Sequence, residues 1–318
     1  MSNRINALIT AGFLTGILII LMIADLAMAK ITPVAGDNSQ SVPKPQLKLQ
    51  TVLDGSFMKE YETYLSEQFV AKESWAELKT RVDILMQKKE INGVYLCKDD
   101  YVIECIKPED VDRTVLEKRL KLLEDFVEQY DARVMLVPTA DNILTDKLPG
   151  WAQYYDQQVL LEEVRARIGE AYLIDVMSRL KEHAEEEIYY RTARRWTMLG
   201  AYYGYQEWKQ ATGSVAYRRW QKEDLDNGEL QEYTPKEGQP IQQIETGYRG
   251  RKDLVLIKNS FADGMIPFLT VHYSNIYVVD LQNDSGSLEK LIGSYVDGGA
   301  EVLLLYDCIG FIESFQYQ

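Results

Sequence analysis

Residues 254–263 decide the fold class of this chain, and they read LVLIKNSFAD. A run of branched apolar residues leads into a polar turn at 258–260 and then into a predicted helix over 261–272. The other short apolar runs are 133–137, 172–176, 276–279 and 302–305, and the predicted helices between them are 157–169, 197–210 and 287–298. Buried strands that alternate with helices are typical of a parallel sheet covered on both faces, so we predict an α/β, doubly wound domain.

Ser260 follows this predicted strand directly and is our candidate nucleophile. In open α/β sheets, ligands bind outside the carboxyl ends of the strands, where Ser260 and the candidate substrate-binding residue Asn259 are expected to lie. The competing interpretation is that Ser260 only caps the next helix, with Asp263 as its capping-box partner. A serine nucleophile also needs a general base, which is usually an oriented histidine.

Neither of the two histidines is well placed to act as that base. His183 lies in an acidic helical segment, where a solvated role is expected. His272 lies farther along the helix predicted after Ser260, roughly 18 Å away at the rise of an α-helix. The chain also has no cluster of cysteine and histidine with metal-ligand spacing. We therefore predict no metal site and no cofactor.

The cysteines are Cys97, Cys105 and Cys308. A hairpin is predicted over 93–103, with its turn at Asp99 and Asp100. This register would place Cys97 opposite Val102, which disfavours a disulfide between Cys97 and Cys105. Buried free thiols are the expected state.

An amphipathic helix is predicted over 111–129. Its apolar face consists of Val115, Leu116, Leu120, Leu123 and Val127. Aromatic residues at helical spacing, among them Phe57, Tyr61 and Tyr64, predict a packed helix at the start of the domain. By contrast, residues 213–250 are polar and are predicted to form a loop or an insertion.

The composition is that of a globular protein, with 46% apolar and 26% charged residues in 318. The 35 basic and 49 acidic side chains give a formal net charge of −14. An acidic surface repels phosphate groups, so the charge balance disfavours a nucleic-acid-binding function.

The N-terminal residues 7–29 are predicted to be a transmembrane anchor. Their first part carries no charge and is just long enough to cross a slightly thin bilayer. Arg4 on the short N-terminal side predicts that residues 1–6 are cytoplasmic and that the rest of the protein lies outside the cell membrane. Residues 27–29 also fit a signal-peptide cleavage site, in which case the protein is secreted. Beyond the anchor we predict a linker over 30–52 and one extracytoplasmic domain over 53–318.

The densest group of aromatic and basic residues is 189–203, which reads YYRTARRWTMLGAYY. This segment resembles the signature of the DHHW protein family, YYRTDHHWTxLGAYY. The family is similar to the alginate O-acetyltransferase proteins, which have SGNH-hydrolase-like domains. Weaker matches follow in the same order along the chain, from about residue 50 to the C-terminus. They are Asn92–Asp99, Val137–Pro149, Ile257–Leu269 and Val279–Asp280.

The resemblance implies an Asp-x-His pair that acts with a downstream serine in acetyl transfer to an exported polysaccharide. Ser260 matches the serine, but Ala193 stands at the aspartate position, and Arg194 and Arg195 stand at the two histidine positions. Arginine cannot act as a base because its side chain stays protonated. The base and its orienting carboxylate are therefore replaced.

We accordingly predict a membrane-anchored relative of the cell-surface polysaccharide O-acetyltransferases that is catalytically impaired and binds a glycan or an envelope protein. The candidate substrate-binding residues are Tyr190, Arg194, Arg195, Trp196 and Asn259. One alternative is an active O-acetyltransferase or esterase that uses Ser260 with a non-standard base. Another alternative is a structural component of an envelope complex without a ligand.

Overall fold

The computed structural model divides the chain into two compact units, residues 1–88 and 89–318. The described parts are 56–67, 79–83, 85–86, 88–91, 93–216, 218–225, 230–236, 239–281 and 287–317, together with the isolated positions 12, 13, 15, 16, 19 and 50. The predicted anchor at 7–29 and linker at 30–52 thus lie almost wholly outside the described residues. Within the described parts of the chain, no helix has both the length and the apolar character needed to cross a membrane. The predicted domain boundary at residue 53 stays a prediction.

The first unit contains the helix α3 (Ser56–Glu67). Its aromatic side chains contact one another along the helix: Phe57 and Tyr61 are stacked with ring centroids 5.6 Å apart, and Tyr61 and Tyr64 are tilted with centroids 6.0 Å apart. The helical spacing of these aromatics in the sequence therefore predicted the helix correctly.

The second unit is built on a five-stranded sheet with the order β4-β8-β6-β7-β5. The strands are β4 (Arg133–Val137), β8 (Glu301–Asp307), β6 (Leu254–Lys258), β7 (Asn275–Asp280) and β5 (Ile241–Glu245). The first four pair in parallel, and every residue of β6 is buried. Apolar runs without alternation predicted these central strands because both faces of the sheet are covered.

The edge strand β5 corrects the sequence analysis, which treated residues 213–250 as a loop or an insertion. β5 pairs with β7 in the antiparallel direction, with Ile244 opposite Ile276. The sheet is therefore mixed, and not parallel throughout as predicted. β5 reads IQQIE and is only partly buried, so it lacks the apolar run that marks the other strands. The predicted strand at 172–176 is likewise reduced to one bridge between Leu173 and Val134.

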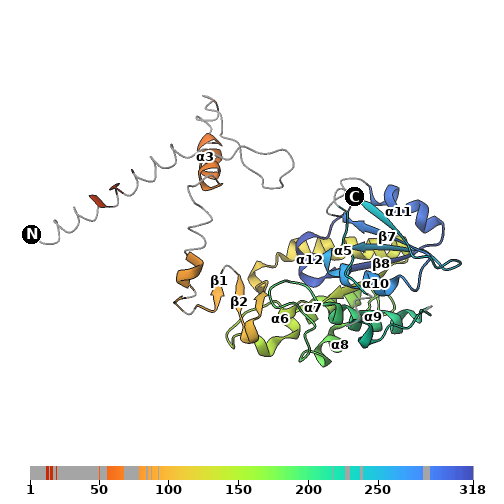
Figure 1. Ribbon diagram of the computed structural model, residues 1–318. Helices are drawn as coiled ribbons and strands as arrows, with labels where there is room; N and C mark the ends of the chain where they lie inside the picture. The colour runs from red at the N-terminus through yellow and green to blue at the C-terminus, as the bar shows by residue number, and fades with distance from the viewer. Residues whose placement is uncertain are drawn as a thin grey trace, which may run out of the picture. The chain divides into compact units, whose positions relative to one another are not determined.

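Helices cover the sheet on both sides, and Figure 1 shows α9 and α11 on opposite sides of strands β7 and β8. The helices of this unit are α5 (Arg113–Tyr130), α6 (Ala140–Ile143), α7 (Gln157–Ile168), α8 (Met177–Glu182), α9 (Met198–Thr212), α10 (Ile266–Leu269), α11 (Leu288–Asp297) and α12 (Cys308–Ser314). Several begin at a side-chain cap, as α5 does at Asp112 and α9 at Thr197. The helix predicted over 261–272 is instead two short helices, η5 (Ser260–Gly264) and α10.

A small three-stranded sheet precedes α5 and consists of β1 (Glu90–Ile91), β2 (Val94–Leu96) and β3 (Val102–Glu104). The predicted hairpin is present, but its register differs by one residue, because Leu96 and not Cys97 lies opposite Val102. Asp99 and Asp100 adopt left-handed φ angles of 56° and 60° in the turn. All three cysteines are free thiols; Cys105 and Cys308 are buried as expected, whereas Cys97 is only partly buried.

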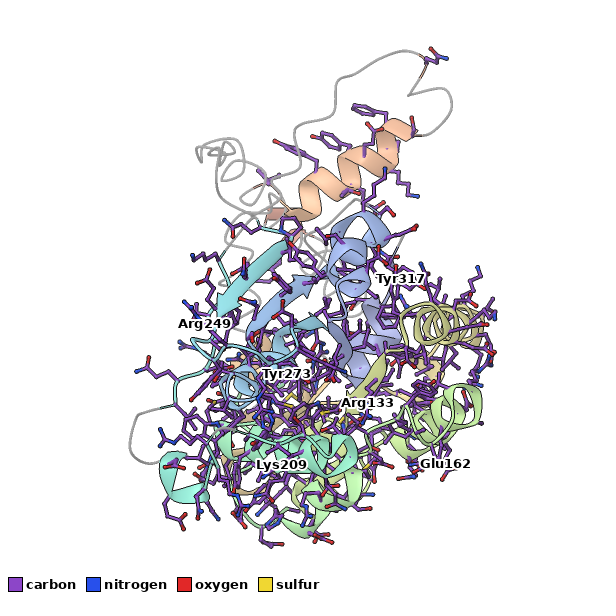
Figure 2. The ribbon with its side chains drawn as sticks, turned by 90° about the vertical axis from the view of Figure 1, so that its right-hand side faces the viewer. Arg133, Glu162, Lys209, Arg249, Tyr273 and Tyr317 are labelled. Atoms are coloured by element: carbon purple, nitrogen blue, oxygen red, sulfur yellow. The ribbon has the colours of Figure 1, made fainter. Side chains whose placement is uncertain are left out.

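The C-terminal residues are held against α5. Tyr317, labelled in Figure 2, lies with its ring centroid 5.8 Å from that of Phe126 and donates a hydrogen bond to the Leu122 carbonyl. Arg119 of the same helix donates hydrogen bonds to the Ile312, Glu313 and Phe315 carbonyls at the end of α12. These groups are the carbonyls that a helix leaves without intrahelical partners, so Arg119 serves as a C-terminal cap for α12.

Candidate functional site

Ser260 lies where β6 ends and η5 begins, at the carboxyl edge of the sheet. The preceding residue, Asn259, fixes this junction. Its Oδ1 accepts a hydrogen bond from the Phe261 N–H at 3.2 Å, and its Nδ2 donates to Asp307 at 2.5 Å. Asn259 and not Ser260 is therefore the cap, which corrects the competing interpretation given above. Ser260 itself is exposed, and its hydroxyl has no hydrogen-bond partner among the described residues.

Asp307 is the buried carboxylate beside this junction, at the end of β8. It caps α12 by accepting a hydrogen bond from the Gly310 N–H at 2.9 Å. Gly310 has to be a glycine here, because a Cβ atom would lie 2.4 Å from Asn259 Nδ2 and 2.6 Å from Asp307 Oδ1. Burial raises the pKa of Asp307, and the Arg194 guanidinium is the largest influence that opposes this shift.

Arg194 occupies the space between this carboxylate and the surface. Its Nε lies 3.9 Å from Asp307 Oδ2, and its Nη1 lies 3.4 Å from Glu313 and 3.7 Å from Glu104. One guanidinium thus joins the ends of β3, β8 and α12. A charge held between three carboxylates acts as their shared counterion, and an anionic ligand would have to compete with all three.

Arg195 points to a different partner. Its Nη1 pairs with Glu232 at 2.6 Å, and its guanidinium lies 5.9 Å from the Tyr190 ring centroid. Burial raises the pKa of Asp263 in η5, and Arg195 is close enough to that carboxyl to oppose part of the shift. The residue after Glu232, Tyr233, donates its N–H to the Asp263 carbonyl at 3.1 Å. Arg195 therefore lies beside the helix that starts with Ser260.

The signature segment is held in place by its aromatic residues. Tyr189 and Trp196 form an antiparallel bridge, and the Tyr189 hydroxyl donates to the Pro138 carbonyl at 2.6 Å. Trp196 is 2% exposed, and its Nε1 donates to the Phe261 carbonyl at 2.7 Å. The buried Trp196 is a scaffold residue, so the structure does not support our prediction that it binds substrate. Ala193 and Tyr190, by contrast, are exposed.

Two glycines of α9 let the helix lie directly on this segment. A Cβ on Gly204 would be 2.6 Å from the Trp196 ring, and a Cβ on Gly200 would be 2.3 Å from the Ile188 carbonyl oxygen. Neither glycine has a left-handed conformation, so close packing alone explains them. The LGAYY part of the segment is thus needed for the fold, whatever the chemistry at Ser260.

The two histidines contact residues other than Ser260. His183 pairs with Glu186 at 2.8 Å and stacks on Tyr203 with ring centroids 3.7 Å apart. His272 is buried between Tyr205 and Ser214, at 2.9 Å and 2.8 Å, and burial lowers its pKa to about 4. His272 precedes β7, at the edge of the sheet opposite to Ser260. The expectation that neither histidine serves Ser260 therefore agrees with the contacts each one makes.

Two buried groups near the carboxyl edge were missed in the sequence. Lys258, the last residue of β6, is 2.7 Å from Asp263, and both side chains are almost fully buried. Asp141 follows β4, and burial raises its pKa to about 6. Its Oδ1 accepts from Thr139 at 2.5 Å, whereas its Oδ2 is buried without a partner. Each of them could have been found in the sequence, because a charged residue within or just after a buried apolar strand signals a buried charge.

The described residues contain no group of three histidine, cysteine, aspartate or glutamate side chains with the geometry of a metal site. The chemistry available around Ser260 is thus an exposed hydroxyl, a capped buried carboxylate and two arginines in ion pairs. Asp307, the carboxylate of this set, is engaged by Asn259, Gly310 and Arg194.

The comparisons with known proteins agree with this architecture. The family model described as DHHW protein matches residues 129–234, which include the signature segment. No curated protein matches the sequence. The structure of Bacillus cereus PatB1 with a sulfonyl adduct is similar with a TM-score of 0.53 and 19% identity, over 71% of this chain and 98% of that one.

Two further solved structures are similar. A DHHW family protein from Eubacterium siraeum has a TM-score of 0.53 and 16% identity, over 71% of this chain and 91% of that one. The O-acetyltransferase domain of Pseudomonas putida AlgJ has a TM-score of 0.44 and 14% identity, over 70% and 96%. The chain thus has the α/β mixed-sheet fold of PatB1 and of the Eubacterium protein, and its resemblance to the DHHW family is confirmed over residues 129–234.

Proposed function

We propose that this protein is a membrane-anchored, exported relative of the polysaccharide O-acetyltransferases that binds a cell-surface glycan or an envelope protein without transferring an acetyl group. The observation that carries the proposal is the state of Ser260, whose exposed hydroxyl has no hydrogen-bond partner among the described residues. The position of the family aspartate is Ala193, and Arg195 at a histidine position is paired with Glu232. Loss of a general base typically costs about 10²–10⁴-fold in rate.

The signature segment also supplies a place for binding. A pocket of about 430 Å³ lies along it, lined by Tyr190 and Arg191 from the segment, by Met198 and Leu199 from α9, and by Lys222. Tyr190 is 38% exposed, and pockets with apolar and aromatic walls and a few polar groups are typical of ligand sites. Arg191 and Lys222 are paired with Glu187 and Glu186, so the pocket favours a ligand of low net charge.

A specific observation favours the second candidate, an active esterase or O-acetyltransferase. Ser260 is exposed at the carboxyl end of a buried strand, and PatB1, which shares the fold, was solved with a sulfonyl adduct. Sulfonyl groups attach to nucleophilic side chains, so a sulfonyl fluoride tests whether Ser260 is activated.

The distinguishing experiment measures aryl acetate hydrolysis and sulfonyl fluoride labelling of the full chain in detergent. We expect the hydrolysis rate of the native protein to match that of Ser260→Ala within about twofold, and no sulfonyl adduct by intact mass, because no base activates the serine. Hydrolysis that disappears in Ser260→Ala, or an adduct mapped to Ser260, would establish the active candidate. A third candidate is a purely structural envelope component. For such a protein, Tyr190→Ala would leave the retention on a glycan unchanged.

A gain-of-function variant tests where the replaced residues lie. Ala193→Asp combined with Arg195→His restores the family residues at both positions, and we expect at least a tenfold gain in aryl acetate hydrolysis, since base catalysis typically contributes 10²–10⁴-fold. Adding Ser260→Ala to this variant should remove the gain. Equal rates for the native and double-variant proteins would mean that these positions do not reach Ser260.

A further inference from the structure

The pocket of about 430 Å³ along the signature segment combines an apolar wall with an exposed aromatic ring, and we call it the signature pocket. Its apolar wall consists of Met198 and Leu199 at the start of α9 and of Leu225 at the end of η4 (Lys222–Leu225). These side chains pack against the core but are only half-buried, so each leaves apolar surface in the pocket. Such surface favours a ligand that carries an apolar group of its own.

The polar groups that line the signature pocket are used within the protein. Thr197 Oγ1 donates to the Glu187 carbonyl at 2.7 Å, and Arg191 Nη2 donates to the Glu187 carboxylate at 2.5 Å. Lys222 pairs with Glu186. Two cations and two carboxylates thus cancel at this site, and a charged ligand would have to compete with an existing ion pair. The ligand that fits best is neutral.

Tyr190 supplies a surface for a sugar at the edge of this pocket. The Arg195 guanidinium lies over its ring at 5.9 Å from the centroid, and the ring contacts no aromatic side chain within the described parts of the chain. A cation over one face leaves the opposite face for the C–H groups of a pyranose. An unsubstituted sugar, however, has only hydroxyl groups at its edge, and these would lose water without gaining partners against the apolar wall.

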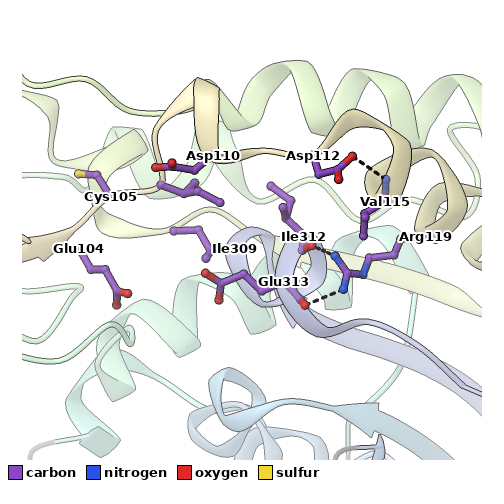
Figure 3. A pocket seen from close by; sticks show the side chains of 10 residues that line it. Glu104, Cys105, Asp110, Asp112, Val115, Arg119, Ile309, Ile312 and Glu313 are labelled. Atoms are coloured by element: carbon purple, nitrogen blue, oxygen red, sulfur yellow. Dashed lines mark hydrogen bonds between the residues drawn. The ribbon is translucent and has the colours of Figure 1, made fainter. Parts of the chain in front are cut away.

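A pocket of about 470 Å³ between β3, α5 and α12 lacks this combination (Figure 3). Among the described residues, no aromatic side chain lines it, and its Ile309 and Ile312 are only 1% and 5% exposed. Its polar side chains serve the fold, since Asp112 caps α5 and Arg119 caps α12. The half-exposed apolar wall beside an exposed ring therefore distinguishes the signature pocket.

We propose that the signature pocket binds an acetylated neutral sugar, with the acetyl methyl group on the apolar wall and the pyranose ring on Tyr190. Acetyl is a small, uncharged substituent with one apolar end, which suits a neutral pocket next to an exposed ring. Esters and amides both carry this group, so O-acetyl and N-acetyl sugars share the required chemistry. This inference rests on the proposed glycan-binding function and adds the feature of the glycan that is recognised.

The test measures the affinity of the full chain, in a detergent without a sugar headgroup, for three neutral tetrasaccharides by titration calorimetry. They are cellotetraose, chitotetraose and O-acetylated cellotetraose, which differ in the presence and the linkage of the acetyl group. We expect at least one acetylated probe to bind about fourfold or more tightly than cellotetraose, since burial of one methyl group corresponds to about this factor. The probe that gains affinity identifies the ester or the amide as the source.

Variants of the apolar wall test the placement of the acetyl group. Leu225→Asn should abolish the preference for the acetylated probe, whereas Leu291→Asn makes the same change at a half-buried position on α11 and should leave it unchanged. Met198→Gln keeps the side-chain length and is the second wall variant, which should also abolish the preference. Thermal melting checks that each variant is folded.

The outcomes separate this inference from the proposed function. Equal affinities of the native protein for all three tetrasaccharides, lost together in Tyr190→Ala, would confirm glycan binding and overturn the recognition of acetyl groups. A preference that persists in both folded wall variants would overturn the placement of the acetyl group in the signature pocket. Absence of binding of every tetrasaccharide at millimolar concentration would contradict glycan binding itself and this inference with it.

Discussion

Replacement of Lys258 by methionine lowers the free energy of unfolding by about 3–5 kcal/mol, because it leaves a carboxylate buried without its counterion. Lys258 Nζ and Asp263 Oδ1 are 2.7 Å apart, and the two side chains are 2% and 6% exposed. Burial already raises the pKa of Asp263, and Lys258 is the main group that opposes the shift. Urea denaturation monitored by tryptophan fluorescence measures the loss.

The control for this experiment removes both charges. Lys258→Met combined with Asp263→Leu takes away the stranded carboxylate, so the double variant should recover most of the stability lost in the single variant. A single variant that falls within about 1 kcal/mol of the native protein would contradict the prediction. It would mean that water reaches Asp263, and that η5 moves to admit it.

Asp141 gives the second large effect, and its size depends on pH. Burial raises its pKa from 3.8 to about 6, so the folded protein binds this proton more tightly than the unfolded chain does. The ionised carboxylate therefore destabilises the fold above pH 6, and the penalty is relieved as the pH falls from 6 toward 3.8. The shift corresponds to about 3 kcal/mol at pH 7 and about half of that at pH 5.

Asp141→Asn should accordingly raise the free energy of unfolding by up to about 3 kcal/mol at pH 7, and by clearly less at pH 5. His272 acts in the opposite sense, since its lowered pKa of about 4 contributes stability that is lost as the pH falls below about 6.5. The difference between the native and variant proteins at each pH cancels the His272 contribution. A difference that stays constant from pH 7 to pH 5 would show that Asp141 does not titrate in this range.

The central part of the fold followed from local patterns in the sequence. The strands β4, β6, β7 and β8 are buried apolar runs, and such runs are visible without knowledge of their partners. The edge strand β5 has only two apolar residues in IQQIE, and its pairing with β7 supplies the rest of its stability. The helix predicted over 261–272 failed because it combined two short helices whose separate turns are set by Asn259 and by packing against α9.

Only the part of the candidate site that depends on local sequence could be predicted. Ser260 could be placed at a strand end from local sequence alone. The contacts of Arg194 could not, because Glu104, Asp307 and Glu313 are distant in the chain, and only the folded sheet brings them together. Asp307 stands just after the predicted strand 302–305 and caps the next helix as Asn259 does, so applying the strand-end rule to every strand would have found it.

The segment from Tyr189 to Trp196 has a mechanical consequence beyond any ligand. It is bonded to the Pro138 carbonyl after β4, to the Phe261 carbonyl after β6 and, through Arg191, to the Val102 N–H of β3. A loop tied to three elements can open only if those elements separate. The hydrogen-bonded amide protons of Tyr190 and Arg195 should therefore exchange with solvent only when the sheet opens, whereas the exposed amides between them exchange freely.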